Sequence, residues 1–324
     1  MTIVYHSKNY NKFLKKIKEE LERTFKGCKR IAIKIHFGEP GNKTAFTPQD
    51  IKPVTNLLKD LDIGFFLFDS PVVYHSLRNN PKTYKKYAAE KGWSALGEIV
   101  ISNDFVIVKG KNLKYEVCKP LVEADGVLVI SHIKGHACSG FGGAIKNLGM
   151  GAVTKKTKKA IHDGGMPVYK GGCVQCGECE KACPLDTLKV KDKPIFGECY
   201  GCSNCIYVCP QNAIKPKVNY FDTLLAESAS IAETKFKKIY YISFLKNITK
   251  ECDCGSNPGK IIAKDSGYLA SKYAVAIDMA AYNIITKNSS EDVFLKFNKK
   301  SGVEQVKEAE KFGMGSSKYK LKEI

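Results

Sequence analysis

The segment that decides the fold runs from residue 31 to residue 70 and contains IAIKIHFG (31–38), TPQDIKPVTNLLKDL (47–61) and IGFFLFDS (63–70). The first and last stretches are apolar runs that predict strands, and the last has the continuous apolar character of a buried strand. The middle stretch predicts a helix, with Thr47 as its N-cap and Pro48 at its first helical position. Pro53 is expected to move the start of this helix or to kink it.

The same alternation continues along the chain. Apolar residues recur at helical spacing from Tyr10 to Phe25, which predicts an amphipathic helix that stops at Gly27. Further strands are predicted at FVIVKG (105–110), GVLVIS (126–131) and KIYYISFL (238–245). Strands that alternate with amphipathic helices indicate an α/β fold with an open, largely parallel sheet and helices on both faces.

A cysteine-rich segment, residues 167–217, interrupts this pattern, which resumes after it. The glycine pairs 164–165 and 171–172 would give it a flexible entry. We therefore expect a small inserted α+β domain at 167–217, between the first part of the α/β core (1–166) and its second part (218–324).

The inserted segment contains the pattern C-x2-C-x2-C-x3-C-P twice, which is typical of bacterial two-cluster ferredoxins. In such a pair of runs, three cysteines of each run bind one 4Fe-4S cluster and the fourth binds the other cluster. Zinc is the alternative, although zinc sites use pairs of cysteines rather than doubled runs of four. The predicted ligands are Cys173, Cys176, Cys179 and Cys209 for one cluster, and Cys199, Cys202, Cys205 and Cys183 for the other.

Composition narrows the class of protein. No apolar run is long enough to cross a bilayer and the first thirteen residues do not resemble a signal peptide, so we expect a soluble cytoplasmic protein. Thirteen cysteines in a long chain, eight of them in a metal-ligand pattern, favour a reducing, anaerobic interior. The net charge of +19 suggests an acidic partner, but only three of the 52 basic residues are arginine. Sequence-specific binding of nucleic acid is therefore not expected.

The predicted strand 126–131 leads into SHIKGHACSGFGGAIKNLGMG (131–151), where a ligand of an open α/β sheet would bind. Three glycines there allow close approach to an anion, and two lysines add positive charge; the alternative is a tight turn without a ligand. The predicted ligand-binding residues are Gly140, Gly142, Gly143, Lys134 and Lys146. In the same loop His132, His136 and Cys138 form a candidate metal site, because imidazole and thiolate suit zinc, iron, nickel or copper.

Asp278 lies on the apolar stripe of the predicted helix in SKYAVAIDMAAYNII (271–285). A carboxylate on a buried face needs a cation or several donors, so Asp278 is a candidate acid or base, or else a cap for a neighbouring loop. Asp69, at the end of its predicted strand, is either an active-site carboxylate or a turn cap, and His36 and Glu39 have the same status.

Cys252 and Cys254, in KECDCGSNPGK (250–260), are surplus to the two clusters. In an extended strand, residues two apart share one face, which would suit a pair of soft ligands. We expect them at the same end of the sheet as the loop His132 to Cys138. The hypothesis is that Cys252 and Cys254, with Cys138 or a histidine of that loop, hold a third metal or form a thiol redox centre, with Asp253 or Asp278 as acid or base; the alternative is two reduced thiols without a partner.

Five stretches together resemble the family of uncharacterised iron-sulfur proteins known as domain of unknown function 362. They are IKIHFGEPGN (33–42), FDSPVVYHSLRNN (68–80), SHIKGHACSGFGGAIKNLGMG (131–151), ITKECDCG (248–255) and SGYLASKYAVAIDMAAYNII (266–285). The resemblance implies a Rossmann-like α/β core, two 4Fe-4S clusters and an anaerobic setting, and it supplies no catalytic residues.

From the sequence we therefore expect an iron-sulfur redox protein whose clusters exchange electrons with a metal, thiol or anion site in the core. Its partner would be a ferredoxin or an oxidoreductase, and a membrane is not expected to take part. Cys252, Cys254, Asp278 and Lys146 are the candidate catalytic residues, should the protein be an oxidoreductase. The alternative is a carrier of clusters or metal that assists the maturation of another enzyme.

Overall fold

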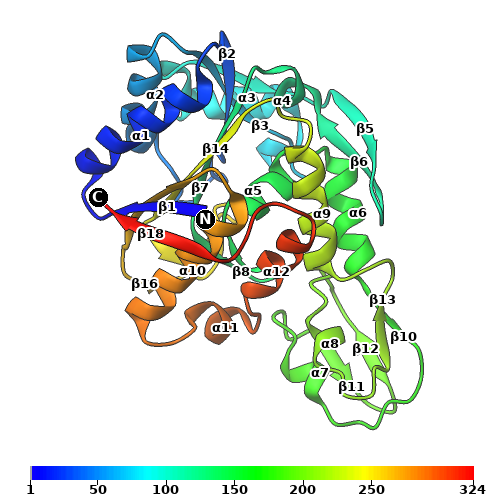
Figure 1. Ribbon diagram of the computed structural model, residues 1–324. Coiled ribbons are helices and arrows are strands. Elements are labelled where there is room, and N and C mark those ends of the chain that lie inside the picture. The colour runs from blue at the N-terminus through cyan, green and yellow to red at the C-terminus, as the bar shows by residue number, and fades with distance from the viewer. Residues whose placement is uncertain (1) are drawn as a thin grey trace.

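The computed structural model describes residues 2–324 and has an eight-stranded sheet at its centre, in the order β18-β1-β17-β14-β7-β2-β3-β4 (Figure 1). The strands are β1 (Thr2–Ser7), β2 (Arg30–Lys34), β3 (Gly64–Asp69), β4 (Glu98–Ile101), β7 (Val127–His132), β14 (Ile239–Leu245), β17 (Gly267–Ser271) and β18 (Tyr319–Glu323). The five strands β14, β7, β2, β3 and β4 run parallel, β17 is antiparallel to both of its neighbours, and β1 is parallel to β18. The predicted α/β class with a largely parallel sheet is confirmed.

Helices cover both faces of this sheet (Figure 1). One face carries α1 (Tyr10–Phe25), α2 (Pro48–Asp60) and α3 (Pro81–Glu90); the other carries α5 (Ala144–Gly151), α9 (Phe221–Glu233), α10 (Ala274–Ser289) and α12 (Val303–Lys311). The remaining helices of the core are α4 (Lys119–Glu123), α6 (Lys155–Gly165) and α11 (Val293–Asn298), with short 3-10 turns η1 (Leu77–Asn79) and η2 (Trp93–Ala95). Within residues 2–324, no helix has the length and apolar character that a membrane crossing requires.

The first two helices form as their sequences predict. Asn9 accepts the backbone N–H of Lys12 at the start of α1. Thr47 and Asp50 form a capping box that starts α2 at Pro48. Pro53 lies inside α2, so the predicted later start of this helix is wrong.

Along each central strand, successive side chains point alternately into the two apolar layers on either face of the sheet, as the pleat requires. In β2, Ile31 and Ile33 pack beneath α1 and α2, whereas Ala32 faces the opposite layer. In β7, Leu128 and Val129 divide between the two layers in the same way. Strands that are buried on both faces explain the continuous apolar runs of the sequence.

The prediction for residues 105–110 is wrong in its placement. These residues do form a strand, β5 (Phe105–Lys109), but it pairs with β6 (Lys114–Cys118) in an antiparallel ribbon outside the main sheet. Alternate residues of β5 are exposed, so β5 lacks the two covered faces of a central strand. Other small pairs of the core are β8 (Lys134–His136) with β9 (Gly140–Gly142), and β15 (Ile248–Thr249) with β16 (Ile261–Ala263).

The cysteine-rich segment forms a small lobe beside the core, at the lower right of Figure 1. Its elements are β10 (Pro167–Tyr169), α7 (Glu178–Lys181), β11 (Leu188–Val190), β12 (Pro194–Phe196), α8 (Asn204–Tyr207) and β13 (Ile214–Pro216). β10 pairs with β13 in antiparallel fashion, so the two ends of the segment meet where they rejoin the core.

Candidate functional site

Polar side chains gather at the edge of the sheet where the parallel strands end. Asp69 and His132 are the last residues of β3 and β7, and His36 follows β2 by two positions. Because parallel strands have their carboxyl ends at one edge, these residues meet the segment that follows β14 and contains Cys252 and Cys254. The structure thus brings several of the predicted residues to one edge of the sheet.

Cys252 and Cys254 lie in a turn in which the Cys252 carbonyl accepts the N–H of Gly255 at 3.2 Å. The predicted extended conformation is therefore wrong, and the turn itself brings the two side chains together. Their sulfurs are joined in a disulfide, with the Cα atoms 5.3 Å apart. A ring nitrogen of His136 and the two sulfurs lie within 4.8 Å of one another, so the reduced pair and His136 could hold a metal ion.

Lys146, on the first turn of α5, points its ammonium at the sulfur of Cys252, at 3.8 Å. In residues 2–324 this ammonium forms no ion pair with a carboxylate. Burial lowers the pKa of Lys146 to about 8. The sulfur of Cys252 thus has a basic side chain beside it, which favours negative charge on that sulfur.

In residues 2–324 the structure does not group His132, His136 and Cys138 as the three ligands of one metal site. His132 uses both ring nitrogens, one towards the Asp253 carboxylate and one towards the Lys246 carbonyl, each at 2.8 Å. Cys138 is buried and points towards the lobe, where its sulfur lies 4.0 Å from the Tyr200 carbonyl. Of the three residues, His136 alone lies against the disulfide.

The start of α5 is occupied by a carboxylate of the chain itself. Asp278, on α10, accepts the backbone N–H groups of Ala144 at 2.7 Å and Ile145 at 2.9 Å. A Cβ on Gly143 would lie 2.3 Å from Asp278, which explains glycine at this position. Burial raises the pKa of Asp278 to about 7, although the two N–H groups act to lower it. The amides expected to face a ligand anion are therefore not free, and Asp278 acts as the cap of α5.

Lys134 and Asp253 belong to a buried polar group behind the disulfide. Lys134 donates to the carbonyls of Thr44 and Asn247 and lies 3.6 Å from the Asp253 carboxylate. Burial alone would raise the pKa of Asp253, but His132 and Lys134 overcome this effect and lower it to about 2. Asp253 is therefore a carboxylate at neutral pH and fixes the turn between the two cysteines. The ammonium of Lys134 is already used by the chain, and it is not free for a ligand.

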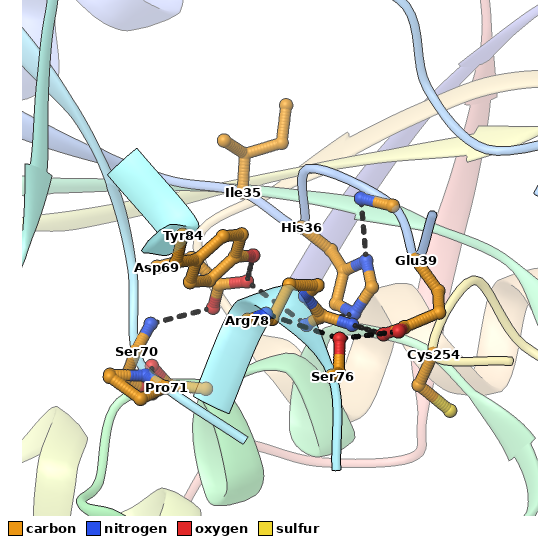
Figure 2. Close-up of polar contacts among 12 residues, drawn as sticks. Ile35, His36, Glu39, Asp69, Ser70, Pro71, Ser76, Arg78, Tyr84 and Cys254 are labelled. Atoms are coloured by element: carbon orange, nitrogen blue, oxygen red, sulfur yellow. Dashed lines mark hydrogen bonds and ion pairs between the residues drawn. The ribbon is translucent and has the colours of Figure 1, made fainter. Parts of the chain in front are cut away.

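Arg78 is the centre of a second buried group at this edge, and Figure 2 shows it between Glu39, His36 and Asp69. Its guanidinium donates to Glu39 at 2.9 Å and to Nε2 of His36 at 2.7 Å, and it lies 3.5 Å from Asp69. The ring of Tyr84 packs 5.0 Å from the guanidinium carbon. Burial, together with Arg78, lowers the pKa of His36 well below its usual value, so this ring is neutral.

Asp69 is shared by several donors. It accepts from Lys34 at 3.0 Å, from the hydroxyl of Tyr84 and from the backbone of Ser70. Burial alone would raise the pKa of Asp69, but Lys34 and the other cations around it hold the pKa below its usual range. The sequence had singled out Asp69, His36 and Glu39, but not Arg78, Lys34 or Tyr84. The available signal was that Arg78 is one of only three arginines among the 52 basic residues.

In the lobe, the eight cysteines lie around two hollows. The first hollow is lined by Cys173, Cys176, Cys179 and Cys209, and the second by Cys183, Cys199, Cys202 and Cys205. These are the two sets of four that the spacing predicted. None of the eight forms a disulfide, and Cys176 is exposed at the outer hollow.

The donor set fits an iron-sulfur cluster in each hollow. Backbone N–H groups approach the sulfurs of Cys173, Cys199 and Cys209 at 3.3–3.4 Å. Hydrogen bonds to the sulfurs are among the features that tune a bound iron-sulfur cluster. Apart from sulfur, the first hollow is lined by apolar and uncharged polar residues, and Glu198 is the one charged residue in the lining of the second.

The second cysteine group is fixed against the core. Lys300 donates to the carbonyl of Cys202 and to the buried carboxylate of Asp222, each at 2.6 Å. Asn204 donates to the carbonyl of Lys299 at 2.8 Å. The second hollow therefore lies at the junction of lobe and core, whereas the first hollow lies farther out.

Three consecutive residues of the core connect the second hollow with the disulfide. Ala137 and Cys138 line the hollow, and His136 lies against Cys252 and Cys254. The Cα atoms of His136 and Cys138 can be at most about 7 Å apart, because each residue spans no more than about 3.6 Å. The cysteine pair and the second hollow are thus close neighbours.

The position of the cysteine turn depends on Gly135 in β8. A Cβ on Gly135 would lie 2.1 Å from the carbonyl oxygen of Lys250 and 2.6 Å from the side chain of Asn298. We expect Gly135→Ala to lower the free energy of unfolding by about 1–3 kcal/mol, because neither neighbour can move without displacing its own segment. Urea unfolding followed by circular dichroism measures this. Gly255→Ala is the control: its added Cβ would have its nearest neighbour at 3.7 Å, and an equal loss there would contradict the explanation.

Residues 31–283 match the family described as "Domain of unknown function (DUF362)". The chain belongs to this family. The matched region includes the cysteine lobe, the disulfide turn and Asp278, so this DUF362 protein carries its candidate site within the family region. No curated protein matches the chain.

Two solved structures are similar to this DUF362 protein over part of their length. One is a Thermotoga maritima protein, Northeast Structural Genomics Consortium target VR152, with 10% identity, a TM-score of 0.47 and coverage of 87% of this chain and 59% of that chain. The other is the lactate racemase apoprotein of Thermoanaerobacterium thermosaccharolyticum, with 14% identity, a TM-score of 0.36 and coverage of 75% and 50%. This chain thus spans 50–59% of the length of these two structures.

Proposed function

We propose that this DUF362 protein is an iron-sulfur redox protein that relays electrons between a partner protein and the cysteine pair at the edge of its sheet. The observation that carries this proposal is the segment 136–138, which lines the second cysteine hollow at one end and lies against Cys252 and Cys254 at the other. A hollow that served only to store a cluster would not need to adjoin a second sulfur site.

The cysteine groups would hold two 4Fe-4S clusters, each of which supplies one-electron transfer when bound. Cys176 lies at the outer hollow and is exposed, so that end is accessible to a redox partner. Val174, also exposed there, offers an apolar contact for the partner. The second hollow is fixed by Lys300 and Asn204 at a constant place relative to the core. The order from partner to core is therefore the first group, the second group and then the cysteine pair.

The core site supplies an acceptor of suitable chemistry. A disulfide takes up two electrons to give two thiols, so it can be served by two successive one-electron transfers. Lys146 beside Cys252 favours the charged sulfur that reduction produces. Such a protein needs a reducing, oxygen-poor compartment, in agreement with the cytoplasmic setting expected from its eight free cluster-type cysteines.

The test is anaerobic purification, with iron and acid-labile sulfide counted per chain, followed by stepwise reduction monitored by electron paramagnetic resonance. We expect two clusters that are reduced and reoxidised reversibly and that stay with the protein when an apo-ferredoxin is added. Rapid transfer of the clusters to the apo-ferredoxin would overturn the relay and favour a carrier that serves the maturation of another enzyme. A protein that binds no iron would overturn both.

A further inference from the structure

The two cysteines of the pair have different surroundings. Cys252 is buried, with 7% of its surface exposed, whereas Cys254 is part-exposed. The sulfur of Cys252 is approached by the ammonium of Lys146 at 3.8 Å and by the backbone N–H of Cys254 at 3.4 Å. In the described residues no comparable donor approaches the sulfur of Cys254. Cys252 is thus the buried cysteine with a cation beside its sulfur, and Cys254 is the more accessible of the two.

His136 favours thiol chemistry over metal binding at this pair. Its Nδ1 accepts the backbone N–H groups of Cys138 at 3.1 Å and Ser139 at 3.2 Å. A neutral imidazole that accepts at Nδ1 carries its hydrogen on Nε2, so the remaining nitrogen is a donor. A metal ligand must instead offer a lone pair at that nitrogen. The backbone N–H groups therefore hold the ring hydrogen of neutral His136 on Nε2, which leaves that nitrogen without the lone pair that a metal needs.

We propose that Cys252 and Cys254 form a dithiol-disulfide exchange centre that reduces a disulfide of another molecule, with Cys254 as the attacking sulfur and Cys252 as the buried sulfur that closes the cycle. The electron source rests on the proposed function. The exchange chemistry itself does not rest on the proposed function, because any dithiol reductant can reduce the Cys252–Cys254 disulfide.

The cycle balances in three steps. First, two electrons from a one-electron donor protein and two protons open the Cys252–Cys254 disulfide to two thiols. Next, the Cys254 sulfur, after loss of its proton, bonds to one sulfur of the substrate R–S–S–R′ and R′–S⁻ leaves with that proton. Finally, the Cys252 thiolate attacks the Cys254 sulfur, R–S⁻ leaves and takes up the proton from Cys252, and the original disulfide is restored. The net reaction converts one disulfide, two electrons and two protons into two thiols.

The surface beside Cys254 suits a protein as the bearer of the substrate disulfide. The Tyr74 hydroxyl donates to the Cys254 carbonyl at 2.7 Å, which places the loop after β3 next to this part-exposed cysteine. Val73, Tyr74 and Leu77 on this loop are large apolar residues with 42–50% of their surface exposed. Figure 2 shows Cys254 at the border of the Arg78 group, beside Glu39. An apolar patch beside a reactive sulfur would be covered by a docked substrate.

The test follows the oxidation state of Cys252 and Cys254 in a single tryptic peptide of the protein. Trypsin cuts after Lys250 and Lys260, and the resulting peptide, residues 251–260, contains Cys252 and Cys254 and no other cysteine. The whole protein is reduced anaerobically with dithiothreitol, freed of it and treated with 5,5′-dithiobis(2-nitrobenzoic acid), a disulfide probe. After acid quenching and blocking of free thiols with N-ethylmaleimide, mass spectrometry of the peptide reports the state of each cysteine.

We expect the wild-type peptide to return to its internal disulfide with little trapped adduct. Cys252→Ser should accumulate a stable adduct on Cys254, and Cys254→Ser should form an adduct on Cys252 about tenfold more slowly, because that sulfur is buried. Equal or faster reaction at Cys252 would overturn the division of roles. A wild-type adduct as stable as that of Cys252→Ser would overturn the exchange centre. Protection of both reduced cysteines by added Zn²⁺ would overturn it in favour of a metal site.

A second arm separates this proposal from the relay. Holoprotein reduced with dithionite should show both cysteines reduced in the same peptide, whereas Cys199→Ser, which lacks a ligand of the second group, should keep the pair oxidised. If dithiothreitol prepares an active pair but dithionite reduces only the clusters, the relay is overturned and the exchange centre stands. If dithionite reduces the pair but the two cysteines react alike, the relay stands and the exchange centre is overturned.

Discussion

Replacing Cys176 and Cys183 together by serine is expected to remove nearly all cluster iron from the protein, although both residues come from the same run of the sequence. Cys176 lines the outer hollow and Cys183 lines the inner one, so the double variant damages both groups. A 4Fe-4S cluster needs all four thiolates for stable binding, and serine is a poor substitute. Iron and acid-labile sulfide, counted per chain after anaerobic reconstitution, measure the loss.

The matched control is Cys176→Ser combined with Cys209→Ser. These residues are 33 positions apart in sequence but line the same hollow, so this double variant should keep about half of the iron, with the spectrum of the inner cluster. Both variants remove two cysteines, so a general effect on folding would lower the iron content of both equally. The crossed pairing is contradicted if the variant from one run keeps half of the iron and the variant from two runs loses nearly all of it.

The cysteine groups were predictable because the information is local. Within a run, tight turns point the sulfurs at a common centre, and Gln175 and Gly201 have the positive φ angles that such turns need. The exchange of the fourth cysteine follows from the doubled spacing alone. The sequence did not show that the second group lies against the core, because that contact depends on residues far along the chain, such as Lys300 and Phe221.

The sheet was predictable where its strands are buried on both faces and less so at its edges. β18 has the sequence YKLKE, in which lysine and glutamate mask the strand, and it forms because Thr2 to His6 of β1 offer it a free edge. The apolar run of β5 predicts a strand, but it does not reveal that the pairing partner is the next strand, β6, rather than a strand of the main sheet. Strand propensity depends on such tertiary context, so single runs do not predict pairing partners.

The site was predictable in its location and only partly in its members. The position of Cys252 shortly after β14 correctly predicted that it would meet the loop after β7. The choice of partner within that loop was decided by the β8–β9 hairpin, which turns His136 towards the pair and Cys138 away from it. Asp278 was singled out correctly as a buried carboxylate in need of donors, but its donors are backbone N–H groups of α5, which no side-chain pattern reveals.

Arg78→Met is expected to lower the free energy of unfolding by about 3–5 kcal/mol, because it leaves charged groups buried without their shared cation. The guanidinium has 2% of its side chain exposed and neutralises Glu39, which has 10% exposed, and Asp69, which has 3%. Asp69 keeps Lys34 as a partner, but Glu39 retains only hydroxyl donors from Ser76 and Tyr74. The shift in the urea midpoint, measured anaerobically by circular dichroism, gives the loss.

Two further variants distinguish the geometry of Arg78 from its charge. Arg78→Lys keeps the charge but cannot reach Glu39, His36 and Asp69 at once, so it should recover only part of the loss. Arg30→Met removes an arginine paired with Glu98 at the surface, where both side chains are more than half exposed, and should cost less than about 1 kcal/mol. If Arg78→Met shifts the midpoint no more than Arg30→Met, or Arg78→Lys behaves as the wild type, the buried arginine does not organise this edge of the sheet. A large loss of stability in both Arg78 variants would instead show that a planar cation with several donors is required beside the cysteine turn. The lysine of Arg78→Lys would then have supplied the charge at the same position without restoring stability.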